Sequence, residues 1–140
     1  MKKIAVVYWS GTGNTEAMAK AVLKGAQAAG ASAALYNVAD FDAAKLATLD
    51  AVAFGCPAMG SESLEDSEFE PVFESCKPLL NGKLVALFGS YGWGDGEWMR
   101  TWEDDCKAAG AVLACESIIC NEMPDDEVLA ACQALGKALA

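Results

Sequence analysis

The sequence predicts an α/β fold: a doubly wound parallel sheet of five strands with helices on both faces. Five short apolar runs alternate along the chain with five segments of helical periodicity, an alternation typical of parallel sheets with crossover helices. The runs are continuously apolar, as expected of strands that are covered on both sides. The chain has 140 residues, which suits one domain, and we expect residues 1–140 to form it.

Each element is placed by its own pattern. The expected strands are 4–8, 33–38, 51–56, 84–88 and one segment within 111–120. The expected helices are 14–29, 41–46, 69–80, 98–109 and 128–135. In the first helix, Met18 and Val22 lie on one apolar stripe, and Gly30 is placed to end the helix. Trp98 and Trp102 are also at helical spacing, so we assign both indoles to the core.

The composition is acidic and lacks histidine. Asp and Glu outnumber Lys and Arg 20 to 10, for a formal net charge of −10; this argues against nucleic acid or membranes as partners. The absence of histidine excludes His-based metal sites and His general bases, and we expect neither a metal site nor a catalytic residue.

The six cysteines form no C-x-x-C pair, and the apolar run 4–9 is too short for a secretory signal. We therefore interpret the cysteines as free thiols of a cytoplasmic protein.

A Gly-rich turn follows the first expected strand and opens the first helix. It consists of Ser10, Gly11, Thr12, Gly13, Asn14 and Thr15. The free N–H groups and partial positive charge of a helix N-terminus attract an anion, and the hydroxyl and amide side chains add donors. The turn has no Lys or Arg and lacks the G-K-[ST] ending of a nucleoside-triphosphate loop. We favour an enclosed phosphate here over a turn that merely caps the helix.

The second unusual segment follows the third expected strand and starts a connection of roughly a dozen residues, which is long for this position. It contains Ala58, Met59, Gly60, Ser61 and Glu62. Met59 can pack on a flat aromatic ligand, and Gly60 permits a backbone flip. Glu62 can accept a hydrogen bond from a ring N–H. Taken alone, this segment is better explained as structural.

The third segment follows the fourth expected strand. It consists of Ser90, Tyr91, Gly92, Trp93, Gly94, Asp95 and Gly96. Glycines flank Trp93, which lies off any helical stripe, so its indole is suited to stack on an aromatic ring system. The alternative is a half-buried Trp in a flexible turn. Because the carboxyl ends of parallel strands share one edge of the sheet, the three segments converge and together predict a site for a phosphorylated planar heterocycle.

These motifs resemble those of the short-chain flavodoxins, and the resemblance covers essentially the whole chain. Residues 10–15 fit the family's phosphate signature, (T/S)-x-T-G-x-T, and residues 58–62 and 90–96 are similar to the loops that carry its two flavin-stacking side chains. The resemblance implies a flavodoxin-like sheet of strand order 2-1-3-4-5 and non-covalently bound FMN. It also implies a low-potential one-electron carrier without its own substrate turnover, which shuttles electrons between redox enzymes through semiquinone and hydroquinone states.

The resemblance assigns roles to individual residues. Residues 10–15 would hold the 5′-phosphate of FMN, and Met59 and Trp93 would enclose the isoalloxazine ring. Glu62 would accept a hydrogen bond from the ring N3–H. Backbone amides near Gly92 would face the N1 and O2 edge.

A conformational change is implied as well. The peptide between Gly60 and Ser61 would flip on reduction, so that the Gly60 carbonyl accepts a hydrogen bond from the ring N5–H. Position 61 is Ser where some relatives have Asp.

Acidic residues concentrate within 62–74 and 95–105, beside the expected ring. Such runs are usually solvated faces; here we expect them to steer a monomeric protein towards the basic surfaces of redox partners in transient complexes. The alternative function is an FMN-dependent reductase of quinones or nitro compounds, which would consume NADPH on its own. A signalling receiver domain shares the strand order but needs an acidic pair after the first strand, where this chain has Trp9 and Ser10.

Overall fold

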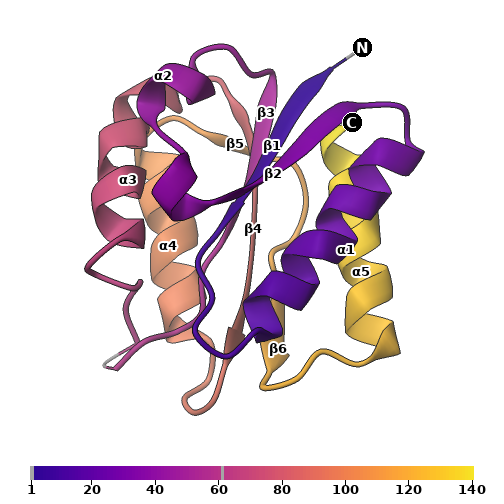
Figure 1. Cartoon of the computed structure of the whole chain (residues 1–140). Coiled ribbons are helices and arrows are strands. Elements are labelled where there is room, and N and C mark those ends of the chain that lie inside the picture. The colour runs from indigo at the N-terminus through magenta and orange to yellow at the C-terminus, as the bar shows by residue number, and fades with distance from the viewer. Residues whose placement is uncertain (1, 61) are drawn as a thin grey trace.

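The computed structural model describes residues 2–60 and 62–140 and contains one parallel sheet. The strand order is β2-β1-β3-β4-β5, with β6 also paired to β4 (Figure 1). The strands are β1 (Lys3–Tyr8), β2 (Ser32–Asn37), β3 (Ala51–Gly55), β4 (Leu84–Tyr91), β5 (Val112–Leu113) and β6 (Ile118–Asn121). All the strand pairs are parallel, which confirms the fold class and the strand order that the sequence predicts.

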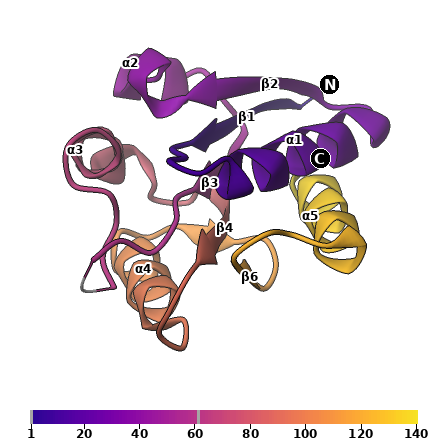
Figure 2. The ribbon, with the colours of Figure 1, turned by 60° about the horizontal axis from the view of Figure 1, so that its bottom comes forward.

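The helices form two layers, one on each face of the sheet. They are α1 (Asn14–Ala28), α2 (Ala43–Leu46), α3 (Phe69–Cys76), α4 (Glu97–Ala108) and α5 (Asp126–Leu139), with short 3₁₀ turns η1 (Val38–Asp40) and η2 (Lys77–Leu79). Helices α1 and α5 pack side by side on one face, and α2, α3 and α4 cover the other (Figures 1 and 2). The central strands β1, β3 and β4 are therefore buried on both sides, which explains their continuously apolar sequences.

An aromatic cluster lies between the sheet and helices α3 and α4. The ring of Trp102 meets those of Phe69 and Phe73 edge-on, with centroids 5.5 and 5.8 Å apart. Trp98 and Trp102 are each 2% exposed, which confirms their expected place in the core. Because Phe69 is the first residue of α3 and is fully buried, this cluster holds the far end of the long connection that leaves β3.

Two elements differ from the sequence prediction. The fifth strand, expected as one segment within 111–120, is divided into β5 and β6, which pair with the beginning and the end of β4. Between them the chain leaves the ladder, and the Ser117 hydroxyl donates to Glu103 of α4 at 2.7 Å. Helix α3, expected to reach residue 80, ends at Cys76 because Pro78 has no N–H donor and restricts the residue before it, so the chain continues as a 3₁₀ turn.

Candidate functional site

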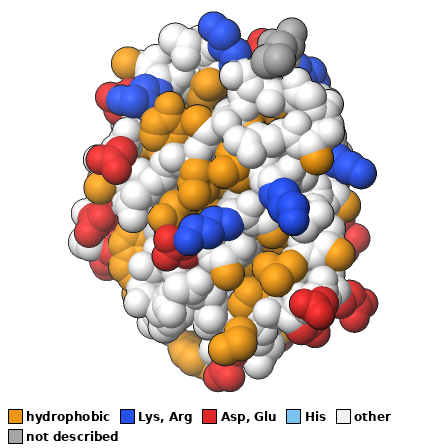
Figure 3. All heavy atoms as spheres, turned by 45° about the vertical axis from the view of Figure 1, so that its right-hand side comes forward, with side chains coloured by type: hydrophobic (Ala, Val, Ile, Leu, Met, Phe, Trp, Pro, Cys, Tyr) orange, Lys and Arg blue, Asp and Glu red, His pale blue; other side chains and the backbone are white. Residues whose placement is uncertain are grey.

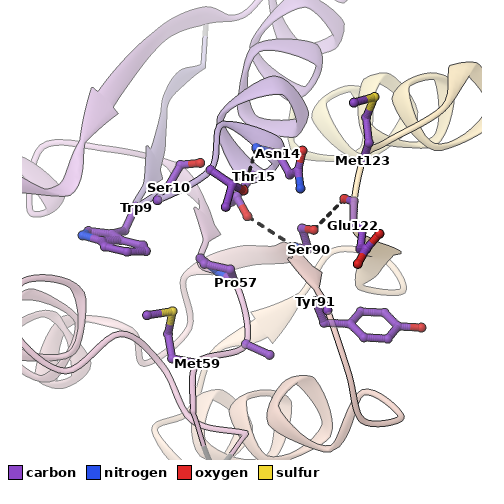
Figure 4. Close-up of a pocket in the computed structure, with 14 residues that line it drawn as sticks. Trp9, Ser10, Asn14, Thr15, Pro57, Met59, Ser90, Tyr91, Glu122 and Met123 are labelled. Atoms are coloured by element: carbon purple, nitrogen blue, oxygen red, sulfur yellow. Dashed lines mark hydrogen bonds between the residues drawn. The ribbon is translucent and has the colours of Figure 1, made fainter.

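A cavity of about 480 Å³ lies at the carboxyl ends of the strands, within the size range of small-molecule sites (Figure 4). Four segments supply its lining: the turn after β1 with the start of α1, the loop after β3, the end of β4 with Gly92, and the loop after β6. The lining residues are Trp9, Ser10, Gly11, Thr12, Asn14, Thr15, Pro57, Ala58, Met59, Ser90, Tyr91, Gly92, Glu122 and Met123. None of these residues is Lys or Arg, so any anion bound here must be held by backbone and neutral side-chain donors.

The turn 10–15 brings the start of helix α1 to this cavity. Gly13 has φ 96°, a left-handed conformation that suits glycine, and the helix begins at the next residue. The Ser10 Oγ accepts the N–H groups of Gly13 at 3.0 Å and Glu16 at 3.3 Å. Since that oxygen already accepts twice, its own proton remains to be donated into the cavity.

Several backbone donors of the same turn have no acceptor among the described residues. These are the N–H groups of Gly11, Thr12 and Thr15, of which Thr15 belongs to the first turn of α1. The positive end of the helix dipole lies at the same place. Free N–H groups at a helix N-terminus form an anion site without a cationic side chain.

Hydrogen bonds link the segments that line the cavity, and Figure 4 shows those of Ser90 with Thr15 and Glu122. The loop after β3 is linked as well, because the Ala58 N–H donates to the Ser90 carbonyl at 3.0 Å. The Ser90 N–H donates to Thr15 Oγ1 at 3.3 Å, and the Ser90 hydroxyl donates to the Glu122 carbonyl at 2.7 Å. Thr15 is 1% exposed and Ser90 is 4% exposed, so the bond between them is shielded from water, whereas the bond to Glu122 is partly buried. The start of α1, the loop after β3, the end of β4 and the loop after β6 are therefore held in fixed relation around the cavity.

The loop after β3 is a short hairpin. Met59 and Ser63 exchange two backbone hydrogen bonds, from Met59 N–H at 2.9 Å and from Ser63 N–H at 3.1 Å. At the tip, Gly60 has φ 40° and Glu62 has φ 55°, an uncommon conformation for a residue with a Cβ. Ser61, which the family resemblance places in the flipping peptide, lies outside the described residues.

The Glu62 carboxylate faces a second, smaller hollow beside the cavity. This hollow is lined by Ala58, Met59, Gly60, Glu62, Gly92 and Trp93. Glu62 Oε1 is buried and has no hydrogen-bond partner among the described residues. A Cβ added at Gly94 would lie 2.2 Å from this oxygen, so the glycine provides the space in which the carboxylate sits. An acceptor in this position requires a donor that the described chain does not supply.

The two indoles that follow β4, those of Trp93 and Trp98, have different environments. Trp93 is 63% exposed, whereas Trp98 is buried and its Nε1–H donates to the Cys56 carbonyl at 3.2 Å. Asp95, in the same loop as Trp93, is engaged by Arg100 of α4, which donates to its Oδ1 at 3.0 Å and to its carbonyl at 3.1 Å. Trp93 is thus presented on a loop that α4 anchors, with most of its surface open to a ligand or partner.

The sequence-predicted residues separate into three groups in the structure. Most line the cavity, whereas Gly60, Glu62 and Trp93 line the smaller hollow. Gly13, Gly94 and Asp95 line neither; they shape the helix start, the space for Glu62 and the loop anchor described above. The contacts of all these residues with FMN remain predictions.

Four lining residues were not among the predicted ones: Trp9, Pro57, Glu122 and Met123. Glu122 and Met123 follow β6, so the rule that ligands bind beyond the carboxyl ends of strands would have found them if applied to the fifth strand. Met123 is 77% exposed. Glu122 has φ 59°, and its N–H donates to the Tyr91 carbonyl at 2.7 Å.

Other kinds of site are not found in residues 2–60 and 62–140. This part of the chain has no group of three or more His, Cys, Asp or Glu side chains arranged to hold a metal ion. None of its helices is long and apolar enough to span a membrane.

Comparison with known proteins identifies the family. The flavodoxin sequence model matches residues 6–135. The flavodoxin of Megasphaera elsdenii is 48% identical over 137 residues, which cover 98% of each chain. That of Clostridium beijerinckii is 46% identical over 135 residues, which cover 96% of this chain and 97% of the relative. The solution structure of two-electron reduced M. elsdenii flavodoxin matches with a TM-score of 0.89 and covers 97% of both chains. The chain therefore belongs to the flavodoxin family of FMN-binding electron carriers.

Proposed function

We propose that this chain is a one-electron carrier of low reduction potential that passes electrons between redox enzymes through the semiquinone and hydroquinone states of FMN. It has no substrate turnover of its own. The observation that carries the proposal is the buried Glu62 Oε1, which lacks a donor and adjoins the hollow lined by Met59 and Trp93. A ring N–H seated in that hollow would supply the missing hydrogen bond.

The phosphate of FMN is assigned to residues 10–15. The assignment is supported by the unpaired N–H groups of Gly11, Thr12 and Thr15 and by the spare hydroxyl proton of Ser10. Thr15 Oγ1 accepts from Ser90, so the Thr15 hydroxyl proton is also available to an anion. These neutral donors fit a phosphate that is enclosed and held at the positive end of α1.

The isoalloxazine ring is assigned to the space between Met59 and Trp93. The half-buried thioether of Met59 offers a polarisable surface, and the exposed indole of Trp93 offers a flat one. Glu62 then accepts from N3–H. The left-handed conformation of Gly60 supports a rearrangement of the following peptide, whose carbonyl would accept from N5–H on reduction.

The electrostatic surroundings favour a low potential. FMN supplies the redox chemistry when it is bound. The chain supplies Glu62 and Glu122 beside the ring site, and no Lys or Arg lines the cavity. A negative charge added to the ring in this partly enclosed place is therefore poorly compensated, and the fully reduced protein should be a strong reductant.

The partners are redox proteins with basic surfaces, bound transiently by a monomer. On the face shown in Figure 3, acidic side chains lie along the left edge and at the lower end of the molecule, whereas the lower end shows no basic side chain. Opposite charges speed encounter, so the rate of electron transfer to a basic haem protein should fall as salt is added. The six free cysteines are consistent with the cytoplasm, and residues 1–140 are taken as one domain.

Titration of the apoprotein with FMN tests the ring assignment. Indole fluorescence should fall as FMN binds, because the ring would quench the tryptophans beside it. Of the tryptophans, Trp9 lines the cavity and Trp93 lines the smaller hollow, so the fall should be smaller in Trp93→Phe, where only Trp9 remains beside the ligand. Unchanged fluorescence at saturating FMN would contradict the stack.

A separate experiment tests the alternative function. NADPH mixed with the pure holoprotein and a quinone should not be consumed; steady consumption would indicate a reductase instead.

A further inference from the structure

Glu65 carries a buried carboxylate that has no cationic partner among the described residues. The residue is 5% exposed, and none of the ion pairs formed by the described Lys and Arg residues includes it. Instead the carboxylate accepts the N–H groups of Ser67 at 2.9 Å, Glu68 at 2.7 Å and Phe69 at 2.8 Å, together with the Ser67 hydroxyl. Glu65 therefore caps the start of α3 from four residues upstream.

The backbone of Glu65 makes a second connection, to the end of β3. Its N–H donates to Cys56 Sγ at 3.4 Å, and the thiol of Cys56 donates to the Pro57 carbonyl at 3.5 Å. Cys56 is fully buried, and burial raises the pKa of its thiol to about 12, so the thiol is protonated and serves as both donor and acceptor. We call Cys56 and Glu65, with these hydrogen bonds, the base clamp.

The base clamp closes the loop 57–64 at its two ends. Further along the loop, the backbones of Met59 and Ser63 pair with each other, and the tip lies between these two residues. The left-handed residues Gly60 and Glu62 belong to this tip. Two sets of hydrogen bonds therefore cross the stem of the loop, whereas none is found across the tip between the described residues Gly60 and Glu62.

We propose that the base clamp is a positioning device for the flavin-contacting loop: it fixes the stem of the loop, holds Met59 against the cavity and thereby sets the position from which Glu62, in the tip, reaches the ring site. The inference rests on the proposed function, because Met59 and Glu62 matter to the ring only if FMN binds as assigned. Cys56 and Glu65 line neither hollow, so they act through the loop and not by touching the ligand.

The test compares Glu65→Gln with two matched controls. Glu65→Gln keeps the size of the side chain but replaces one acceptor oxygen by an NH₂ donor. That donor cannot accept the backbone N–H groups that the carboxylate oxygen accepts. Asp66→Asn removes the same charge one residue further on, from an exposed side chain. Asp42→Ala removes a side-chain helix cap of the same kind at α2, where Asp42 accepts the Lys45 N–H at 2.9 Å. Cys56→Ala provides a second way to open the clamp while leaving the cap of α3 in place.

The first readout is amide hydrogen exchange in the apoprotein, which does not depend on FMN. We expect exchange at Met59 and Ser63 to accelerate about fivefold in Glu65→Gln and Cys56→Ala, as expected for loss of one cap-sized interaction. Exchange at these amides should be unchanged in Asp66→Asn and Asp42→Ala. Acceleration confined to 67–69 in Glu65→Gln, with no change at Met59 or Ser63 in either clamp variant, would make Glu65 a helix cap only and overturn the proposal.

The second readout is FMN itself. Both clamp variants should bind FMN about fivefold more weakly and should stabilise the semiquinone less, whereas the controls should match the parent protein. Parent-like affinity and parent-like potentials in both clamp variants would also overturn the proposal. Failure of the parent protein to bind FMN would refute the proposed function, and the exchange experiment would still decide whether the clamp holds the loop.

Discussion

The Ser90 N–H donates to Thr15 Oγ1 at 3.3 Å, across a separation of 75 residues in the chain. This bond joins the end of the central strand β4 to the first turn of α1. It leaves the Thr15 hydroxyl proton free to point at an anion, so one side chain both fixes the loop 10–15 and offers a donor to the phosphate that we assign to it. Structure and binding should therefore respond together to a change at Thr15.

Thr15→Val tests this double role. Valine has nearly the same shape but neither accepts the Ser90 N–H nor donates a proton, so a buried donor is left unpaired. We expect the apoprotein to lose about 1–3 kcal/mol in its free energy of unfolding, measured by urea denaturation, and FMN to bind more weakly. Thr12→Val is the control, because Thr12 is exposed on the same turn and makes no bond to β4. It should weaken FMN binding with little loss of stability; equal stability losses in the two variants would contradict the assignment.

Gly94→Ala tests the space that holds the Glu62 carboxylate. The added Cβ would lie 2.2 Å from Glu62 Oε1, and the backbone has φ 90°. We expect the carboxylate to be displaced and FMN affinity to fall about tenfold, equivalent to ~1.4 kcal/mol. Fluorescence titration with FMN measures this loss.

Two further variants separate the clash from the backbone strain. Gly30→Ala introduces a Cβ at φ 95° with no atom within 4 Å, so it should cost stability but leave FMN affinity unchanged. In a Glu62→Ala background, Gly94→Ala should weaken FMN binding much less than it does alone. Equal effects of Gly94→Ala in the two backgrounds would show that it does not act through Glu62.

Gly136→Ala tests the contact between α1 and α5. A Cβ at this position would lie 2.1 Å from the Val22 carbonyl oxygen and 2.8 Å from the Ala26 nitrogen, both of them backbone atoms of α1. At an exposed helical position, Ala is more stable than Gly by about 1 kcal/mol. Here we expect the opposite sign, a loss of about 2–3 kcal/mol measured by urea denaturation. A stabilised variant would refute the close approach of the two helices.

The loss of stability at low pH should depend on the protonation of Glu65. Burial alone would raise its pKa, but hydrogen bonds from Ser67, Phe69 and Glu68 outweigh burial and lower the pKa from 4.5 to about 2. A lowered pKa in the folded state stabilises the fold above pH 4.5, and this contribution, about 3 kcal/mol, is lost as the pH falls from 4.5 through 2. The parent protein should therefore lose more stability between pH 7 and pH 3 than Glu65→Gln does. Parallel stability curves for the two proteins would contradict this assignment.

The sequence predicts the fold well because its signals are local and repeated. Continuous apolar runs identify buried strands, and Trp98 and Trp102 at helical spacing identify one core face, as the structure confirms. The interruption between β5 and β6 was missed because Glu116 and Ser117 are the only polar residues within 111–120, too short a break to divide an otherwise apolar run. The loop carrying Glu122 and Met123 was not recognised as part of the site because the rule on strand ends was applied only to the first, third and fourth strands.

Other parts of the site could not be read from the sequence because they depend on distant residues. Glu65 caps α3 from four residues before its start, whereas a sequence search for a cap examines the residue next to the helix. Gly94 looks like a residue that merely permits a turn, and its role in accommodating Glu62 is visible only when two loops are brought together. Contacts of this kind, between residues of different loops, cannot be predicted from composition or from residue spacing.

Stepwise reduction of the FMN-loaded protein with dithionite, followed by visible absorption, tests the central claim most directly. The proposed one-electron carrier should start yellow, pass through a blue neutral semiquinone as the first electron is added, and bleach only at a much lower potential. Direct bleaching without the blue species, or a colourless protein that does not take up FMN, would contradict the account.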